Sequence, residues 1–294
     1  MSRTKARRVG LELLLTTCVL SAVLAACGGA RPQAKSGGPP ARLKARDAGA
    51  ADAKTEPYAG KMAYVIVALC DNVNQGIVPV APALGNGDDA DRNLYWGARF
   101  GVRTHFKASR EWQLVSSARD PSPKVIERLV YKHKSSDAYM VADAYRGAEI
   151  RQATADFLNA ASGNTNPTVE IRGKTYGLSR GAAAHLVAYV GHDGLMDFQL
   201  AYTPKRRDDV RRDAVILACV SKKYFAPSLK ESGANPLLWT TNLMAPEAYV
   251  LKAALDGWLL DEDGERVRER AAKAYNTYQS CGIRAARSLF ATGW

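Results

Sequence analysis

The stretch from His185 to Ser221 decides the fold of this chain. It reads HLVAYVGHDGLMDF over residues 185–198, continues through the charged loop PKRRDDVRRD at residues 204–213, and ends as AVILACVS at residues 214–221. The two short apolar runs are typical of strands that are buried on both faces of a parallel sheet. The first run ends at Gly191-His192-Asp193-Gly194 and the second at Ala218-Cys219-Val220-Ser221. Because ligand sites of open α/β sheets lie beyond the carboxyl ends of the strands, we expect an imidazole and a thiol to face each other there.

The rest of the chain alternates predicted strands with predicted helices. Apolar runs predict strands over residues 62–69, 112–115, 138–144 and 237–241, and residues 168–176 have the pattern of a small hairpin. Apolar periodicity predicts helices over residues 91–106, with Asp91 as the N-cap, and over residues 148–161, 246–260 and 265–290. Residues 125–132 fit neither pattern. This alternation predicts an α/β architecture in which helices cover a mostly parallel central sheet.

The first 27 residues have the organisation of a secretion signal. Basic residues precede the apolar stretch LELLLTTCVLSAVLA, and small residues close it at Leu24-Ala25-Ala26-Cys27. This tetrapeptide resembles the lipobox of bacterial lipoproteins, in which the cysteine is acylated (palmitate) and becomes the mature N-terminus. The resemblance implies an exported protein held on a bacterial membrane by the lipid on Cys27, facing the periplasm or the cell surface. An ordinary cleaved signal and a membrane anchor are the alternatives, although the apolar run is too short to span a bilayer comfortably.

Composition separates a linker from a folded domain. Residues 28–57 contain mainly Gly, Pro, Ala and charged residues, which predicts a flexible linker. Residues 58–294 remain as one domain that is long enough for a large core. The formal net charge of +12 leaves +6 in this domain, because residues 1–27 and 28–57 carry +3 each. This modest charge argues against nucleic acid as a partner, whereas the positive linker is suited to lie against anionic lipid headgroups.

Three cysteines lie in the predicted domain, namely Cys70, Cys219 and Cys281. An odd number outside the cytoplasm suggests a free thiol, and a bridge between Cys70 and Cys281 is one possible pairing. No Cys/His spacing indicates a zinc site, and no cofactor is predicted. The GNGDD loop at residues 85–89 lacks the ligand register of a calcium loop, so we interpret it as a polar turn.

A GxSxG pattern occurs at Gly177-Leu178-Ser179-Arg180-Gly181. In serine hydrolases this motif requires a helix after the serine and a triad histidine later in the chain. Here a strand is predicted to follow, and His192 is the only downstream histidine. We therefore interpret Ser179 as part of a turn.

His192 and Cys219 have the chemistry of a cysteine nucleophile with its acid–base partner. A thiolate attacks carbonyl carbon, and a neighbouring imidazole lowers the thiol pKa from about 8.5 and returns a proton to the leaving amine. We expect backbone amides around Gly194 and Cys219 to supply donors for the developing oxyanion. Of the four histidines, only His192 follows a predicted strand between glycines.

The segments YVGHDG and VILACVS resemble the caspase-like cysteine peptidases, which include caspases, gingipains, legumains, separases and bacterial CHAT domains. The resemblance implies a three-layer sandwich around a mostly parallel sheet, with Cys219 as nucleophile, His192 as general acid/base and a peptide or protein as substrate. Asp71 matches the acid that lines the S1 pocket of basic-specific members, which implies cleavage after Lys or Arg. The chain is also similar to uncharacterised bacterial lipoproteins that share the stretches NLYWGARFGV and GHDGLMDF.

Asp193 departs from the family pattern, in which a glycine usually follows the histidine. We expect Asp193 to contact substrate, to orient His192 or to cap the turn, and the amide of Gly194 to face the oxyanion.

Three functions remain open from the sequence. The first is a cysteine endopeptidase. The second is a non-catalytic binding or scaffold lipoprotein that keeps the caspase-like fold, because a cysteine on an apolar strand commonly packs as a small core residue. The third is a hydrolase that uses the acidic GNGDD loop at residues 85–89 together with a metal ion.

Overall fold

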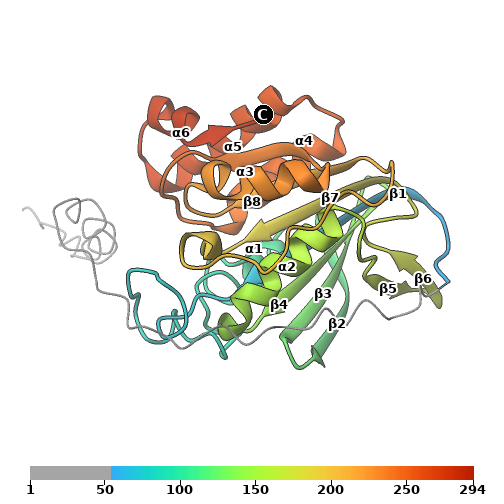
Figure 1. The fold of residues 1–294 in the computed structure, drawn as a ribbon, viewed down its shortest axis with the longest axis horizontal. Coiled ribbons are helices and arrows are strands. Elements are labelled where there is room, and N and C mark those ends of the chain that lie inside the picture. The colour runs from blue at the N-terminus through green and yellow to red at the C-terminus, as the bar shows by residue number, and fades with distance from the viewer. Residues whose placement is uncertain (1–53) are drawn as a thin grey trace, which may run out of the picture. The chain divides into compact units, whose positions relative to one another are not determined.

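The computed structural model describes residues 54–294, which are built around an eight-stranded sheet with helices on both faces (Figure 1). The expected signal at residues 1–27, the lipidation site Cys27 and residues 28–53 of the expected linker lie outside the described residues. Within residues 54–294, no helix is both long enough and apolar enough to cross a membrane.

The strands are short, and most of them alternate with helices along the chain. The strands are β1 (Tyr58–Ala68), β2 (Trp112–Ser122), β3 (Val125–His133), β4 (Ala138–Tyr145), β5 (Thr168–Ile171), β6 (Lys174–Gly177), β7 (Ala182–Val190), β8 (Arg212–Leu217), β9 (Asn235–Thr240) and β10 (Phe290–Ala291). The helices are α1 (Val102–Lys107), α2 (Ile150–Ala161), α3 (Ser221–Ser232), α4 (Ala248–Leu259), α5 (Gly264–Gln279) and α6 (Ile283–Leu289), together with the short 3-10 helices η1 (Gly147–Glu149) and η2 (Gly194–Met196).

The sheet is mostly parallel, as the sequence predicts. Its order is β10-β9-β8-β7-β1-β4-β3-β2, and the five neighbours from β9 to β4 run parallel. Only β10, β3 and β2 are antiparallel to their neighbours. Val67 in β1 pairs with Val190 in β7, and Val190 pairs with Leu217 in β8. These three strands therefore end level with one another.

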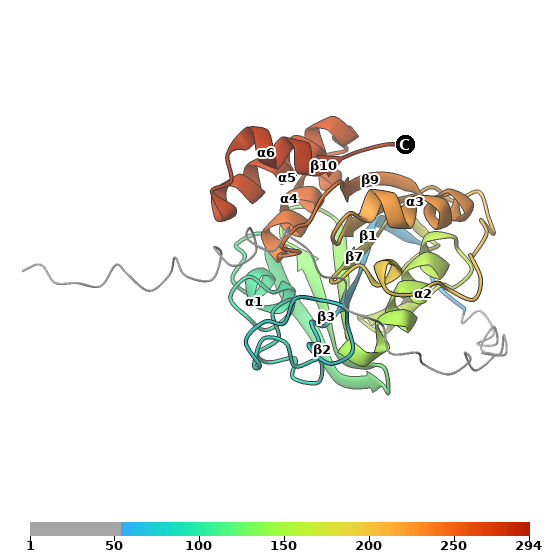
Figure 2. The ribbon, with the colours of Figure 1, turned by 60° about the vertical axis from the view of Figure 1, so that its left-hand side comes forward.

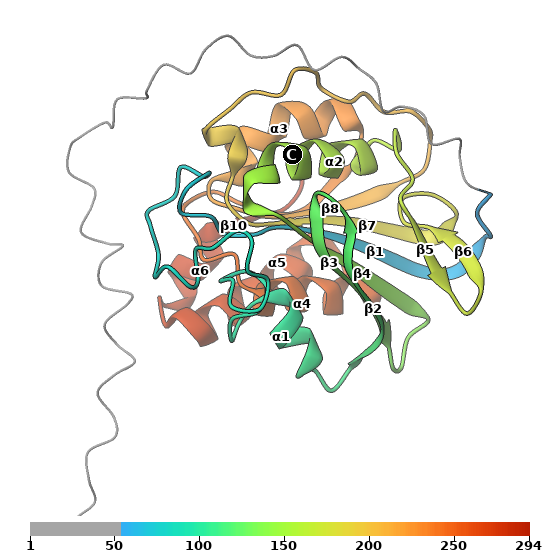
Figure 3. The ribbon, with the colours of Figure 1, turned by 90° about the horizontal axis from the view of Figure 1, so that it is seen from below.

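Each face of the sheet carries its own hydrophobic core. In β1, Ala63, Val65 and Val67 face a core shared with α1, α4, α5 and α6, and the alternate residues face a core shared with α2 and α3. Figures 2 and 3 show α2 and α3 together on one side and the other helices on the opposite side. Because both faces are covered, the parallel strands have continuous apolar sequences rather than alternating ones.

The predicted helix over residues 91–106 is wrong over about its first three turns, since α1 begins only at Val102. Residues 91–101 form turns, and only α1 is helical. Asp91 does not cap a helix, because its carboxylate accepts hydrogen bonds from Arg103 and Arg119. Gly97 lies so close to the chain that an added Cβ would be 2.1 Å from the carbonyl oxygen of Asp91. This close backbone approach replaces the regular helix.

The remaining differences concern helix ends and one unpredicted helix. The predicted helix at residues 265–290 divides into α5 and α6, because Ser280 and Gly282 both have positive φ angles, 51° and 87°. Helix α3 was not predicted, and it contains Pro227, which lacks the amide hydrogen of a helix interior. The ambiguous residues 125–132 belong to β3, which pairs on both sides. The predicted hairpin at residues 168–176 is confirmed as β5 and β6.

Candidate active site at the carboxyl edge of the sheet

The order of the sheet reverses at β1. The chain places β4 on one side of β1 and later β7 on the other. In doubly wound sheets a ligand crevice opens at such a point, beyond the carboxyl ends of the strands. The loops that follow β1 and β7 meet there, because the amide of Gly76 donates a hydrogen bond to Oδ2 of Asp197 at 2.9 Å. Gly76 is needed for this approach, since a Cβ would lie 2.3 Å from Oδ1 of Asp197.

His192 is held rigidly at the exit of β7. The preceding Gly191 has a φ angle of 149°, and an added Cβ would lie 2.7 Å from the carbonyl oxygen of Ala68. The hydroxyl of Tyr189 donates to the carbonyl oxygen of His192 at 2.8 Å. The imidazole is 7% exposed, and its Nε2 lies 2.7 Å from Oδ2 of Asp197. A carboxylate at this distance favours the tautomer with hydrogen on Nε2, which leaves Nδ1 as a proton acceptor.

Asp193 is fully buried beside this pair. Its Oδ1 accepts a hydrogen bond from the amide of Leu195 at 3.0 Å and so caps η2. Its Oδ2 is buried without a hydrogen-bond partner among the described residues. Burial, opposed by the hydrogen bond from the Leu195 amide and assisted by the nearby charge of Asp197, raises the pKa of Asp193 to about 7. Of the roles expected for Asp193, the structure shows the turn cap, whereas it is Asp197 that orients His192.

Cys219 follows β8 and is partly exposed. Its sulfur accepts a hydrogen bond from the amide of Met244 at 3.4 Å and lies 3.6 Å from the carbonyl oxygen of the same residue. Burial raises the pKa of the thiol; the Met244 amide opposes this rise, and the charge of Asp193 adds to it. The resting thiol is therefore protonated at neutral pH.

A strained residue follows Cys219 directly. Val220 has a φ angle of 51°, in the left-handed region that β-branched residues rarely occupy. The amide of Val220 donates to the carbonyl oxygen of Asn242 at 3.0 Å, and the amide of Ser221 donates to Oγ1 of Thr240 at 3.1 Å. These contacts to the last residue of β9 and to the loop after it fix the sharp turn from β8 into α3. Strained backbone of this kind is concentrated at functional sites.

The structure places His192 and Cys219 at the same edge of the sheet without a hydrogen bond between their side chains. They leave adjacent, paired strands, and the charge of Asp193 reaches the thiol of Cys219. Among residues 54–294, no hydrogen bond joins the imidazole of His192 to the sulfur of Cys219. Catalytic contacts are commonly loose before substrate binds, and a hydrogen bond from the thiol to His192 would replace its contact with the Met244 carbonyl oxygen.

Two backbone amides at this edge have no hydrogen-bond acceptor among residues 54–294. Within the described part of the chain, no hydrogen bond uses the amide of Gly194 or of Cys219 as its donor. An added Cβ at Gly194 would lie 2.6 Å from the ring of Phe198, so a glycine is required there. The two amides that the sequence predicted as oxyanion donors are therefore not engaged elsewhere in residues 54–294.

Asp71 serves the turn after β1. Its Oδ1 accepts hydrogen bonds from the amides of Val73 and Asn74 at 2.8 and 3.1 Å, and its Oδ2 accepts one from Nδ2 of Asn74 at 2.8 Å. Gly87 and Gly147 pack directly against it, since a Cβ on either would lie 2.3 Å from an Asp71 side-chain atom. Asp71 is 5% exposed, and both oxygens of its carboxylate accept hydrogen bonds. This arrangement gives no support to Asp71 as the floor of a pocket for a basic side chain.

Sequence reasoning missed Asp197 and Met244. An acid five residues after the histidine is visible in GHDGLMDF, but only the nearer Asp193 was considered as a residue that could orient His192. Nothing local to Cys219 indicated Met244, which lies 25 residues away. All three described cysteines are free, so the bridge considered between Cys70 and Cys281 is not formed.

The acidic loop shows no metal-binding arrangement. Asp88 pairs with Arg146 at 2.7 Å, and Asp89 pairs with Arg92 at 2.7 Å. Among residues 54–294, no group of three or more His, Cys, Asp or Glu is placed to hold a metal ion.

Comparison of the chain with protein-family models, with curated proteins and with solved structures gives no match. The residues at the carboxyl edge are thus the basis for a functional assignment.

Proposed function

We propose that this chain is a lipoprotein, anchored to a bacterial membrane through Cys27, whose domain is a caspase-like cysteine endopeptidase. Cys219 is the nucleophile, His192 is the general acid/base, and the substrate is a peptide or protein in the periplasm or at the cell surface. One observation carries the proposal: the His192–Asp197 pair, with its 2.7 Å contact, follows the strand that pairs directly with the strand preceding the partly exposed Cys219. The lipid anchor rests on the lipobox-like sequence.

Because the resting thiol is protonated, its proton must be removed as the sulfur attacks the substrate. Nδ1 of His192 takes the proton of Cys219 as the sulfur attacks the carbonyl carbon, so that a C–S bond forms and the carbonyl π bond opens. The free amides of Gly194 and Cys219 are the available donors to the oxyanion. When the C–N bond breaks, the imidazolium returns its proton to the leaving amine. Water then hydrolyses the thioester and restores the thiol.

Asp197 has a defined part in this sequence. Its carboxylate fixes the imidazole tautomer and stabilises the imidazolium that forms during attack. It also ties the loop after β7 to Gly76 in the loop after β1. Asp197 is a positioning residue, because it acts through His192.

The caspase-like assignment is supported by the sheet. It is mostly parallel and covered on both faces, and the strand that precedes the histidine pairs directly with the strand that precedes the cysteine. Cleavage after Lys or Arg rests on the family resemblance alone, because both oxygens of Asp71 are engaged in the turn.

Turnover of fluorogenic peptides tests the proposal. Full-length wild type, Cys219→Ala, His192→Ala and the matched control Cys281→Ala are compared on substrates that end in Arg, Lys or an apolar residue. Turnover that is lost in the first two variants and kept in Cys281→Ala, whose thiol is exposed and remote in sequence, supports the mechanism. Turnover that persists in Cys219→Ala excludes it.

The second candidate is a non-catalytic scaffold. The raised thiol pKa and the two contacts of Cys219 with Met244 favour it, because a structural thiol has these properties. A peptidyl chloromethyl ketone separates the candidates, since it alkylates a thiol efficiently only when a site binds the peptide. Labelling of Cys219 that depends on His192 favours the peptidase, and absence of labelling and of turnover on all substrates favours the scaffold.

A further inference from the structure

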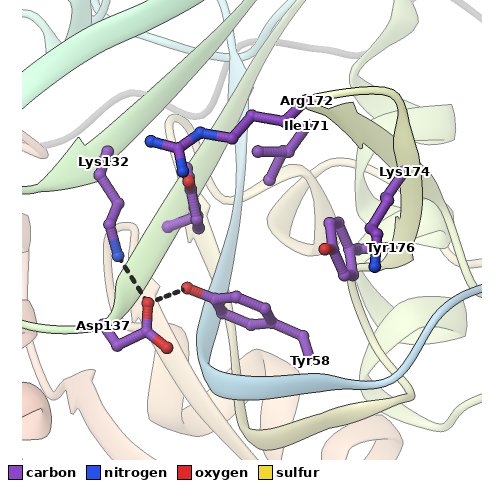
Figure 4. Close-up of a pocket in the computed structure, with 8 residues that line it drawn as sticks. Tyr58, Lys132, Asp137, Ile171, Arg172, Lys174 and Tyr176 are labelled. Carbon is purple, nitrogen blue, oxygen red and sulfur yellow. Dashed lines mark hydrogen bonds and ion pairs between the residues drawn. The ribbon is translucent and has the colours of Figure 1, made fainter.

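A pocket of about 350 Å³ opens at the amino edge of the parallel strands. Tyr58 begins β1 there, Asp137 directly precedes β4, and the hairpin of β5 and β6 forms the opposite wall (Figure 4). Because β7 and β8 run parallel to β1, their carboxyl ends with His192 and Cys219 lie at the other edge of the sheet. The pocket is therefore separate from the proposed hydrolytic site.

Aromatic rings line the pocket. The ring of Tyr58 makes edge contacts with Tyr139 and Tyr176, at centroid distances of 5.6 and 5.3 Å. Ile171 adds an apolar side chain from the hairpin. Ligand pockets combine apolar and aromatic walls with a few polar groups that fix orientation, and these four side chains supply the walls.

One carboxylate and one ammonium group in the pocket neutralise each other. Lys132 Nζ lies 2.7 Å from Oδ1 of Asp137, and the hydroxyl of Tyr58 donates to the same oxygen at 2.5 Å. The Lys132 hydrogen bond and the Tyr58 hydrogen bond lower the pKa of Asp137. Asp137 is therefore ionised at neutral pH and is balanced by Lys132.

Two further cationic side chains in the pocket have no carboxylate partner among the described residues. Within residues 54–294, the side chains of Arg172 and Lys174 form no ion pair or hydrogen bond. In Figure 4, the guanidinium of Arg172 reaches from the hairpin over the pocket toward Lys132, and Lys174 lies beside Tyr176. Three cations against one carboxylate give the pocket a net charge of +2.

The backbone of Arg172 is unusual for its residue type. Arg172 and Gly173 have φ angles of 54° and 73°, and they form the two-residue turn between β5 and β6. Asn and Gly are the residues preferred at both positions of such a turn. An arginine at the first position keeps a long cationic side chain on a rigid support at the pocket rim.

We propose that this pocket binds a phosphate monoester carried on a ring, as in a sugar phosphate or a nucleoside monophosphate. A phosphate monoester carries a charge of about −1.5 to −2 at neutral pH, which matches the excess of +2. The guanidinium of Arg172 and the ammonium of Lys174 are suited to its oxygens, and the tyrosine rings are suited to a ring. The volume lies near the lower end of the range for ligand pockets, which fits a small phosphate monoester.

Titration calorimetry of the full-length protein with AMP, glucose 6-phosphate and inorganic phosphate tests this proposal. We expect saturable binding of one or both ring phosphates, at least about tenfold tighter than inorganic phosphate, from the added ring contacts. Arg172→Asn keeps the left-handed turn and removes the charge, and Lys174→Gln removes the second charge. Each should weaken binding by about tenfold or more, because a charged hydrogen bond is lost. Lys107→Gln, an exposed charge on α1, is the matched control and should leave the affinity unchanged.

The two ring phosphates distinguish the source of the ligand, since a preference for AMP indicates a nucleotide and a preference for glucose 6-phosphate indicates a sugar. The proposal is overturned if neither binds saturably or if inorganic phosphate binds equally well. It is also overturned if Arg172→Asn and Lys174→Gln, each folded by circular dichroism, bind as tightly as Lys107→Gln.

Discussion

Replacing Asp193 with asparagine changes the dependence of stability on pH. Asp193 is fully buried, its Oδ2 has no partner among the described residues, and burial raises its pKa from the ordinary 3.8 to about 7. Between these two pH values the folded chain keeps a proton on this carboxyl that the unfolded chain has released. The stability of the wild type therefore falls as pH rises from about 4 to about 7, and the loss is complete above pH 7.

The size of the effect follows from the pKa difference. At about 1.4 kcal/mol for each pKa unit, the rise from 3.8 to about 7 corresponds to an upper limit of about 4 kcal/mol. The asparagine side chain of the variant does not ionise, and its amide oxygen can still accept the hydrogen bond from Leu195. The stability of Asp193→Asn relative to wild type should therefore increase by up to about 4 kcal/mol between pH 4 and pH 8.

Urea unfolding of both proteins at intervals from pH 4 to pH 9 measures this difference. Other titrating groups are common to both proteins and cancel in the comparison, apart from neighbours such as Asp197 and Cys219. Asp209→Asn, at a fully exposed carboxylate, serves as the control and should show no comparable trend. A difference between Asp193→Asn and wild type that stays constant across this range would refute the reasoning.

Three further outcomes follow from the structure. Iodoacetamide at pH 7 should modify the exposed Cys281 at least about tenfold faster than Cys219, whose pKa is raised by burial, as measured by peptide mapping. Arg128→Met should destabilise the fold by about 3–5 kcal/mol in urea unfolding, because it leaves the buried Asp143 without the cation that lies 2.6 Å away. Asp197→Asn should lower the turnover of peptide substrates by about tenfold or more, because the imidazole loses its carboxylate partner.

A specific result would contradict each of these three predictions. Equal labelling rates for Cys281 and Cys219 would contradict the burial of the second thiol. Arg287→Met, which removes an exposed partner of Glu269, is the control for Arg128→Met, and an equal loss of stability in both would show that the buried pair has no special role. A wild-type rate in Asp197→Asn would exclude the positioning role.

The sequence by itself determined the fold class and the edge of the sheet that carries the candidate site. Apolar runs such as those of β1, β7 and β8 are stable only where both faces are covered, so the pattern specifies parallel strands between layers of helices. Parallel strands bring their carboxyl ends to one edge, so the sequence alone assigns His192 and Cys219 to the same edge.

Only the tertiary structure decided which side chains work together at that edge. Asp197 bonds both to His192 and to Gly76, which lies 121 residues earlier, and Cys219 contacts Met244 from the loop after β9. The same holds for Asp71, whose carboxylate accepts hydrogen bonds within its own turn and is enclosed by Gly87 of the same connection and by Gly147 at the start of η1. Local periodicity reports whether a residue is buried in its own strand or helix. Local periodicity does not indicate which loops pack against that residue, because those contacts depend on how distant segments meet once the sheet has formed.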